Sequence, residues 1–481
     1  MKRDNSAKQE ARKLMMVNQP IGRVIIKMAI PTIVAFLINS IYSLADTYFV
    51  SGLGTNATAA VSVNASLDQL IMMCGSMLAI GANSYIARLL GQGDEKKASQ
   101  VLSTSFFLAL GIGALLMIVG SIFLTPMVRL LGATPTCETY AADYARYVLY
   151  AAPFMTTSFV MNQCLRSEGS ATLSMIGMGF GGILNCILDP LFILGSEGLA
   201  AKYGIVLPFY FPGMGVAGAS VATAISKVVS FAILIFPYIT RRSLLRLSIK
   251  YFHCTWDIIS QVVSVGSSSM FRNLLGVVAA IILNDLAGDI SDSVLAGVGV
   301  CTKVMMFPFG IVLGFGTGFQ PVAGFNWGAG RFDRVKQSFR FASIVALIGG
   351  AVIGVSLALL ADPIIVAFAG DDPQMREIGG LAIRLQCLAL PLHGWVAVVN
   401  MLCAGLGNAG GALALATSRQ GSCFLPILYP MAWLWAEYGI ASVQAVADVL
   451  SLALAIPIAI HMWKKITAAE RTALSAQPQS D

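Results

Sequence analysis

Charged residues are scarce in this chain of 481 residues. Asp, Glu, Lys and Arg make up 11% of it, whereas a soluble protein carries about 25%, so a water-facing surface cannot be covered. Hydrophobic residues make up 57%, and the mean hydropathy is +0.76. Apolar runs of about 20 residues, the length that crosses a bilayer as a helix, recur from end to end. The composition predicts an all-α polytopic membrane protein, because the alternating ten-residue segments of an outer-membrane barrel are absent.

Histidine is scarce as well, and paired cysteines are lacking. The three histidines lie far apart, and the nine cysteines are scattered without a CxxC motif or a Cys/His pair. This pattern argues against a disulfide framework or a zinc site, and the missing HExxH motif excludes a zinc protease. We therefore expect no metal and no cofactor. The net charge of +7 comes from basic residues clustered in loops, which membrane topology explains, so we expect no nucleic-acid partner.

Twelve apolar spans can be drawn, and alternate connections between them are basic. Lys96, Arg166, Arg241 and Arg331 fall in such connections on one side, and the opposite loops are poor in Lys and Arg. The bias places both termini in the cytoplasm of a multi-pass protein of the cell membrane. The expected spans are residues 28–51, 58–87, 99–126, 140–164, 171–195, 216–239, 257–286, 293–325, 338–362, 376–403, 409–436 and 439–463.

The two halves of the chain resemble each other. Pro126 recurs as Pro363, and Pro153 recurs as Pro391, so the offset between the halves is constant to within one position. Six spans in each half give a parallel repeat, in which two lobes are related by a pseudo-two-fold axis along the membrane normal, as in some transporters. We expect an N-terminal tail (1–27), an N-lobe (28–240), a cytoplasmic linker (241–256), a C-lobe (257–463) and a C-terminal tail (464–481).

Asp46 is a carboxylate inside an apolar span, and Asp189 repeats the anomaly. A charge near a helix centre costs about 2.5–3.5 kcal/mol on insertion scales, and such residues mark an ion or substrate path by default. Asp46 lies as far beyond Lys27 as Asp189 lies beyond Ser170, so both reach about the same depth. The equal separations predict one site. The alternative is two carboxylates that meet interfacial water.

The residues around Asp189 suit a cation. Asn185 lies four residues earlier, on the same helix face, and otherwise serves as an interhelical contact. Pro190 lacks an N–H and disrupts the helical bond to the carbonyl of Cys186, which frees an acceptor. Two carboxylates, an amide and a loose carbonyl suit a proton or a small hard cation.

At these residues the chain resembles the multidrug and toxic compound extrusion (MATE) family, over roughly residues 20–465. Several segments carry the resemblance together and in order. They are Pro31 followed by Asp46-Thr47-Tyr48-Phe49-Val50-Ser51-Gly52-Leu53-Gly54, then Asn185-Cys186-Ile187-Leu188-Asp189-Pro190, Gly213-Met214-Gly215-Val216-Ala217-Gly218-Ala219-Ser220-Val221-Ala222-Thr223, Gly318-Phe319-Gln320-Pro321 and Asn326-Trp327-Gly328-Ala329.

The resemblance implies a V-shaped, two-lobe antiporter that exports organic, often cationic, drugs against inward H⁺ or Na⁺. It implies an N-lobe cation site formed by Asp46, Asn185, Asp189 and Thr223. Pro31 would be where the first span bends, and Pro190 in the fifth span would be a second hinge. Asn162 would line the adjacent drug cavity. Another branch of the family places an acid in the seventh span, where the stretch GSSSMFRNLLGVVAAIILN (residues 266–284) has none and Arg272 is its only charge.

The remaining polar residues have two readings each. Tyr42, Gln320, Arg272 and Asn284 are candidates for the substrate cavity. Gln320 and Asn284 equally suit contacts between helices, and Arg272 could pair with an acid or reach an interface. We expect small organic molecules and the lipid bilayer as partners, and a monomer.

Three other functions were weighed. A flippase for lipid-linked sugars resembles a fourteen-span version with a basic cavity, which twelve spans and paired acids disfavour. An intramembrane aspartyl enzyme lacks a GxGD-type setting at either Asp, and a channel lacks a filter motif. The coupling ion stays open between H⁺ and Na⁺, with H⁺ preferred because two acids can share a proton.

Overall fold

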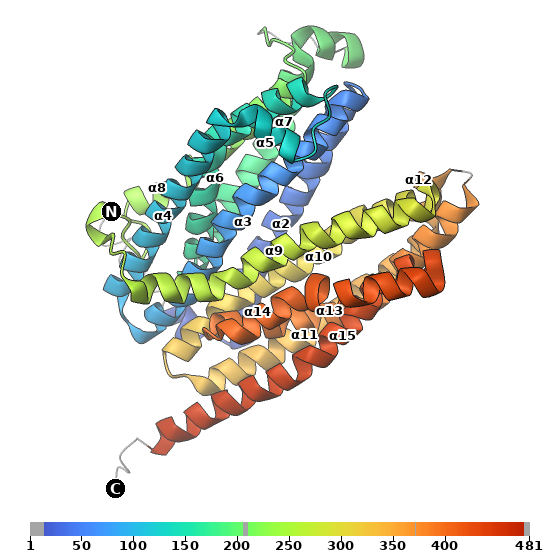
Figure 1. The fold of residues 1–481 in the computed structure, drawn as a ribbon. Helices are drawn as coiled ribbons and strands as arrows, with labels where there is room; N and C mark the ends of the chain where they lie inside the picture. The colour runs from blue at the N-terminus through green and yellow to red at the C-terminus, as the bar shows by residue number, and fades with distance from the viewer. Residues whose placement is uncertain (1–13, 205–209, 371, 476–481) are drawn as a thin grey trace. The chain divides into compact units, whose positions relative to one another are not determined.

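The computed structural model describes residues 14–204, 210–370 and 372–475, without the side chains of residues 47, 51, 55, 56, 58, 202 and 203. The outer parts of both predicted tails and two residues of the first-span motif, Thr47 and Ser51, thus lie outside the described residues or side chains. Within the described ranges every regular element is a helix (Figure 1). The helices are α2 (Ile21–Ser51), α3 (Thr55–Gln92), α4 (Glu95–Ile122), α5 (Leu124–Leu130), α6 (Glu138–Ser167), α7 (Ala171–Tyr203), α8 (Val216–Ile239), α9 (Trp256–Ile290), α10 (Asp292–Gly328), α11 (Phe332–Leu359), α12 (Ala361–Ala369), α13 (Pro373–Gly405), α14 (Ala409–Thr417) and α15 (Leu425–Ser475), with short turns η1 (Ile249–Tyr251) and η2 (Ser418–Ser422).

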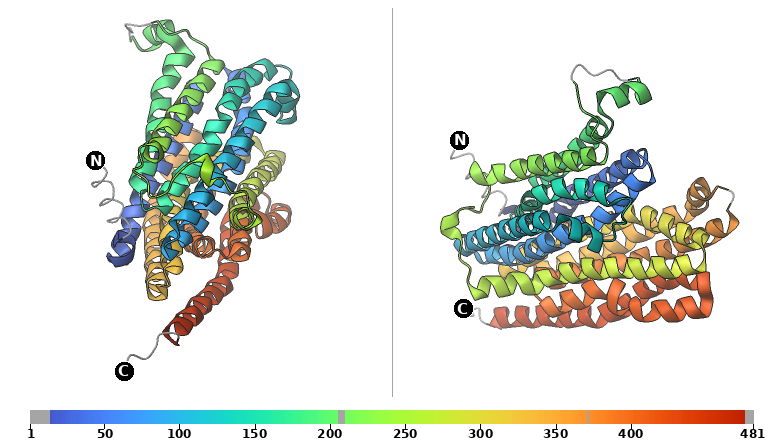
Figure 2. Two further views of the ribbon diagram at one scale, coloured as in Figure 1. Left: turned by 90° about the vertical axis from the view of Figure 1, so that its left-hand side faces the viewer. Right: turned by 45° about the horizontal axis from the view of Figure 1, so that its top comes forward.

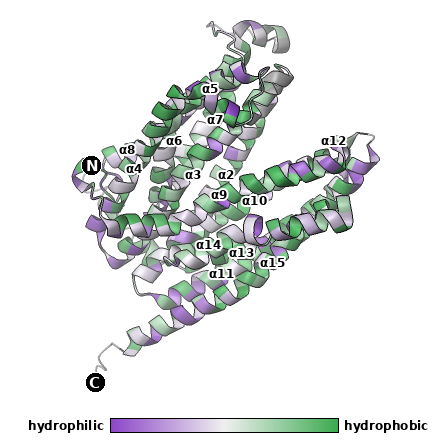
Figure 3. Cartoon of the chain, in the orientation of Figure 1, coloured by the Kyte–Doolittle hydropathy of each residue, from purple (hydrophilic) through white to green (hydrophobic). Residues whose placement is uncertain are grey.

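Ten described segments are long and apolar enough to cross a membrane. One of them, Ala409–Ser475, spans 67 residues and leaves the helical conformation at Ala436 (φ 45°, ψ −121°), so it supplies two crossings. Helix α6 has 30 residues but carries buried polar residues such as Thr156, Asn162 and Arg166, which lower its hydropathy. With α6 counted, the described helices provide the twelve predicted crossings. Figure 3 shows hydrophobic residues along much of these helices.

The chain divides into two compact units. Among the described residues, unit 1 contains Val34–Ile86 and Glu95–Val262, and unit 2 contains residues 14–33, Ala87–Asp94 and residues 263–475. In unit 1, α4, α6 and α8 pack together, and in unit 2, α10, α11, α13 and α15 do so (Figures 1 and 2). The division passes through α2 shortly after Pro31. The lobe boundaries expected from the sequence stay predictions.

Glycines let helices approach closely at equivalent places in the two units. A Cβ added to Gly113 would lie 2.5 Å from the Cα of Pro153. A Cβ added to Gly350 would lie 2.7 Å from the Cα of Pro391. Gly350 and Pro391 follow their counterparts at the offset that relates the two halves of the sequence. The repeat seen in the sequence is therefore also a repeat of packing.

A buried hydrogen bond recurs in the same way. The Asn162 amide donates to the Ser174 carbonyl at 3.1 Å, and the Asn400 amide donates to the Ala412 carbonyl at 2.7 Å. Both residues of the second pair follow those of the first at the same offset as Pro391 follows Pro153. These bonds fasten the end of one helix to the start of the next, in each unit by itself.

The register changes after α7. A Cβ on Gly218 would lie 2.2 Å from the Phe192 carbonyl oxygen, and one on Gly439 would lie 2.0 Å from the Met431 carbonyl oxygen. Met431 follows Phe192 at nearly the same offset as the earlier pairs, whereas Gly439 follows Gly218 at a smaller one. Unit 1 therefore contains an insertion between α7 and α8. Positions up to α7 match unit 2 at the larger offset, and positions in α8 match it at the smaller offset.

Candidate cation and substrate site

A buried polar cluster joins α7 to α8 in unit 1. The Asn185 amide nitrogen donates to Asp189 Oδ1 at 3.1 Å and to Thr223 Oγ1 at 3.2 Å. These three side chains are 2%, 0% and 6% exposed, respectively. Asn185 and Asp189 share one helix face because they are four residues apart. The structure thus brings together three of the four predicted cation-site residues through direct bonds.

Asp46 on α2 completes the set through its charge. It interacts electrostatically with Asp189 and with Tyr144, whose side chain is buried on α6. Asp46 Oδ1, Asp189 Oδ2 and Asn185 Oδ1 are buried, and the described residues give none of them a hydrogen-bond partner. Buried oxygens without partners are costly, so a bound proton or small cation would relieve them.

No cluster of typical metal-binding side chains is found among the described residues. Among the described residues, no group of three or more His, Cys, Asp or Glu side chains is arranged to hold a metal ion.

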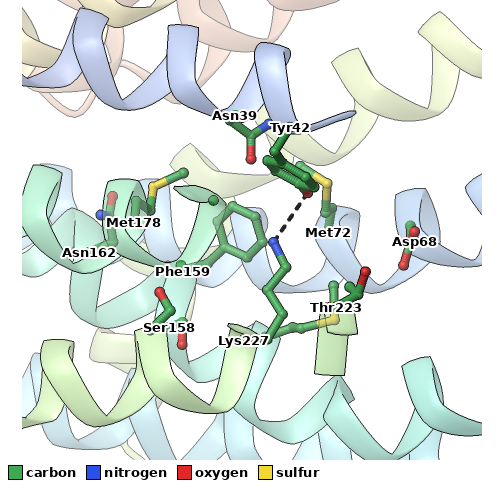
Figure 4. Close-up of a pocket in the computed structure, with 14 residues that line it drawn as sticks. Asn39, Tyr42, Asp68, Met72, Ser158, Phe159, Asn162, Met178, Thr223 and Lys227 are labelled. Atoms are coloured by element: carbon green, nitrogen blue, oxygen red, sulfur yellow. Dashed lines mark hydrogen bonds between the residues drawn. The ribbon is translucent and has the colours of Figure 1, made fainter. Parts of the chain in front are cut away.

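A cavity in unit 1 adjoins this cluster (Figure 4). It encloses about 720 Å³ of empty space, counted with the part open to solvent. Thr223 lines the cavity and also accepts the bond from Asn185. Tyr42 and Asn162, both predicted cavity residues, line it as well. Methionine and aromatic side chains supply much of the apolar wall, namely Met72, Met155, Phe159 and Met178.

Two charged residues of the cavity wall were not among the predicted site residues. Asp68 lies on α3 and Lys227 lies on α8, and both line the cavity. Each is a lone charge within a predicted apolar span, which is the same signal that singled out Asp46. A search for lone charges in apolar spans could have found each of them, whereas their electrostatic interaction depends on how the helices pack.

Arg166 is also placed differently from the expectation. The sequence predicts Arg166 in a basic connection, but its side chain is 1% exposed at the end of α6. Its Nε donates to Ser174 Oγ at 2.9 Å, and its guanidinium lies 5.9 Å from the centre of the Phe36 ring. The helix runs further than the predicted span, so the residue is buried rather than exposed in a connection.

The two prolines predicted as hinges lie inside helices. Pro31 is within α2, and Pro190 is within α7. The non-helical residue in α7 is Gly195 (φ 68°, ψ −179°), which comes later in the helix than Pro190. Near this bend, the carbonyl of Phe192 accepts from the Met214 N–H at 2.8 Å. The bend in α7 thus falls at a glycine that tolerates positive φ, and movement at either proline stays a prediction.

The other predicted cavity residues belong to unit 2, while the cavity is lined by unit 1 alone. Gln320 on α10 is fully buried, and neither polar atom of its amide has a hydrogen-bond partner among the described residues. Arg272 on α9 donates to Ser269 Oγ at 3.1 Å. Asn284 is exposed on the same helix. A role for these three in cargo binding stays a prediction.

Comparison with known proteins places this arrangement in context. The MatE family profile matches residues 31–191 and again residues 268–429, which are the two repeats. A FAD transporter of Shewanella oneidensis is 28% identical over 380 residues, covering 78% of this chain and 81% of that protein. The multidrug export protein MepA of Staphylococcus saprophyticus is 26% identical over 444 residues, covering 91% of this chain and 93% of that protein.

A solved structure shares the fold. It is a crystal structure of MATE in complex with MaL6, with a TM-score of 0.86, 22% sequence identity, and coverage of 95% of this chain and 99% of that chain. The predicted fold class, twelve helices in two lobes of a polytopic membrane protein, is confirmed.

Proposed function

This chain belongs to the MatE family of membrane transporters, and on that premise we propose that it is a secondary active exporter that moves small organic molecules out of the cell in exchange for inward H⁺. Membership makes it a transporter and not an enzyme, so the intramembrane aspartyl enzyme weighed from the sequence is wrong. In this proposal it is a multi-pass protein of the cell membrane with both termini in the cytoplasm, and it works as a monomer.

One observation carries the proposal: Thr223 belongs to both the carboxylate cluster and the cavity. Asp46, Asn185, Asp189 and Thr223 would hold the coupling cation. A change in the charge of the carboxylates would alter the hydrogen bonds of Asn185 and Thr223, and through Thr223 it would alter the cavity wall. Exchange then follows if cation and cargo favour different states of unit 1, because a ligand shifts an equilibrium only by its differential affinity.

The driving force is sufficient for export. One elementary charge that enters through 100 mV supplies about 2.3 kcal/mol. At about 1.4 kcal/mol per tenfold, that free energy supports a gradient on the order of fifty-fold for an uncharged cargo. Proton coupling is preferred because two buried carboxyl groups can share one proton.

The names of the relatives indicate different cargo. MepA is a multidrug export protein, and the Shewanella protein is a FAD transporter. We take multidrug export as the function of this chain. A flippase of lipid-linked sugars is disfavoured, since the chain covers most of MepA and since its described cavity lies beside acids.

Transport in proteoliposomes tests the proposal. Vesicles with purified protein would be loaded with a fluorescent organic probe, and a pH gradient or a sodium gradient would be imposed separately. We expect the pH gradient alone to drive transport. Transport driven by sodium alone would overturn the choice of ion, and transport indifferent to both gradients would overturn antiport.

A further inference from the structure

Helix α8 presents one polar face to the cavity. Thr223, Lys227 and Ser230 all line it, and their spacing of four and three residues places them on one side of the helix. Lys227 follows Thr223 by one turn, about 6 Å along the axis. A lysine of the cavity wall therefore lies one helical turn from the cation cluster.

The ammonium group of Lys227 has hydrogen-bonding capacity to spare. Its Nζ donates to the hydroxyl of Tyr42 at 3.2 Å and lies 4.9 Å from the centre of that ring (Figure 4). This is the one hydrogen bond assigned to Lys227 among the described residues, and an ammonium carries three donors. The remaining donors suit an anionic oxygen.

Asp68 supplies the opposite charge in the same wall. It is an electrostatic partner of Lys227, yet its Oδ1 is buried without a hydrogen-bond partner among the described residues. The cavity therefore presents a donor-rich cation and an acceptor with a free oxygen. A cargo with a single positive charge would satisfy Asp68 but would also meet the charge of Lys227.

We propose that Lys227 binds a carboxylate or phosphate group of the cargo, so that the cavity selects organic zwitterions over simple organic cations. The inference rests on the proposed function, since it names the cargo class of that exporter. The apolar residues Met72, Phe159 and Met178 would hold the flat hydrophobic part of such a molecule, as methionine-rich surfaces do. Asp68 would face a positive group of a zwitterion.

A binding experiment tests the proposal without any ion gradient. Two rhodamine dyes would be used, one with a free carboxylate and the other its methyl ester, which differ only in the anionic group. Fluorescence polarisation with purified full-length protein in detergent would give both dissociation constants. We expect wild type to prefer the carboxylate dye, and this comparison needs no variant. Riboflavin and riboflavin phosphate form the equivalent pair for a phosphate group.

Substitutions then assign the preference to Lys227. Lys227→Met should weaken binding of the carboxylate dye by about tenfold or more, because a charge-assisted bond is lost, and should leave the ester unchanged or tighter. Lys227→Arg keeps the charge and should keep the preference. Lys303→Met, at an exposed lysine of α10, serves as the matched control and should change neither constant. Thermal unfolding would confirm that each variant is folded.

Two outcomes would overturn the inference. One is a wild-type preference for the ester. The other is that Lys227→Met weakens the binding of both dyes equally and that adding Asp68→Asn restores this binding. Lys227 would then only neutralise Asp68. Failure of this inference can be distinguished from failure of the proposed function. Selective binding without gradient-driven transport would support the cargo class and contradict antiport.

Discussion

Equivalent positions of the two units differ in charge. Lys227 of α8 corresponds to Asp448 of α15 at the smaller offset, and Asp189 of α7 corresponds to Ile427 at the larger offset. In unit 2, Asp448 is 2% exposed and pairs with Arg419, whose Nε lies 2.8 Å from Asp448 Oδ1. In unit 1 the acids keep buried oxygens without partners among the described residues. The same framework therefore holds an open ionisable site in one copy and a closed ion pair in the other.

The closed pair in unit 2 is embedded in a cationic setting. The Arg419 guanidinium lies 4.0 Å from the centre of the Phe309 ring, and Arg419 belongs to the π-helical turn η2. Arg419 and Arg272 are electrostatic neighbours of His393, whose ring lies 5.3 Å from that of Phe309. The cavity and the adjoining cluster of unit 1 hold three acids (Asp46, Asp68 and Asp189) and one lysine, so the two copies have diverged in charge.

The largest expected effect is on transport through unit 1. Asp189→Asn and Asp46→Asn should each reduce efflux of a fluorescent drug from cells to background, because a neutral amide can neither take up and release a proton nor balance the charge of a bound cation. Expression should be unchanged. Asp285→Asn, at an exposed acid of α9 in unit 2, is the control and should export normally. Full efflux by both unit 1 variants would remove the cation site from these residues.

Breaking the ion pair should affect stability in unit 2. Arg419→Met leaves Asp448 as a buried charge without its partner, which costs about 3–5 kcal/mol. Thermal unfolding in detergent should show a clear loss. The double variant Arg419→Met with Asp448→Leu should recover most of it, since an apolar pair can replace a buried ion pair. An unchanged unfolding temperature in the single variant would contradict a closed, structural pair.

The glycine contacts should respond alike in both units. Gly113→Ala and Gly350→Ala each place a Cβ within 3 Å of a proline Cα, and overpacking of this kind costs about 1–3 kcal/mol. Gly111→Ala and Gly349→Ala are matched controls, because nothing lies within 4 Å of their added Cβ. Unfolding temperatures would measure all four. If the glycine-to-alanine change lowered the unfolding temperature in one unit but not in the other, the two units would not share this packing.

The smallest effect is expected at the repeated asparagines. Asn162→Ala and Asn400→Ala each remove one buried hydrogen bond, worth about 1 kcal/mol. Both should lower the unfolding temperature slightly. Asn162→Ala should in addition weaken dye binding, since that residue lines the cavity. If wild type and both variants bind the dye equally, Asn162 does not contribute to cargo binding.

Much of the fold could be read from the sequence, because lipid demands long apolar helices with internally bonded backbones. Proline spacings in the sequence predict the repeat. Asn185 and Asp189 were joined by helical periodicity alone. Thr223, by contrast, came from family resemblance, since its bond to Asn185 links positions 38 residues apart.

The missed features depend on which helices pack together. Asp68 and Lys227 are separated by most of unit 1 in sequence, and only packing of α3 and α8 around one cavity shows that they belong together. The bend at Gly195 was assigned to Pro190 because a proline removes a bond, while the actual deviation needs positive φ, which sequence does not display. The burial of Arg166 depends on where α6 ends.

Coupling in unit 1 is tested most directly by comparing two modes of transport in the same proteoliposomes. Asp189→Asn should still exchange labelled for unlabelled cargo without a gradient, since the cavity is intact, but should not accumulate cargo when a pH gradient is imposed. Wild type should do both. Accumulation driven by the gradient in Asp189→Asn, at the wild-type level, would contradict the assignment of the coupling site.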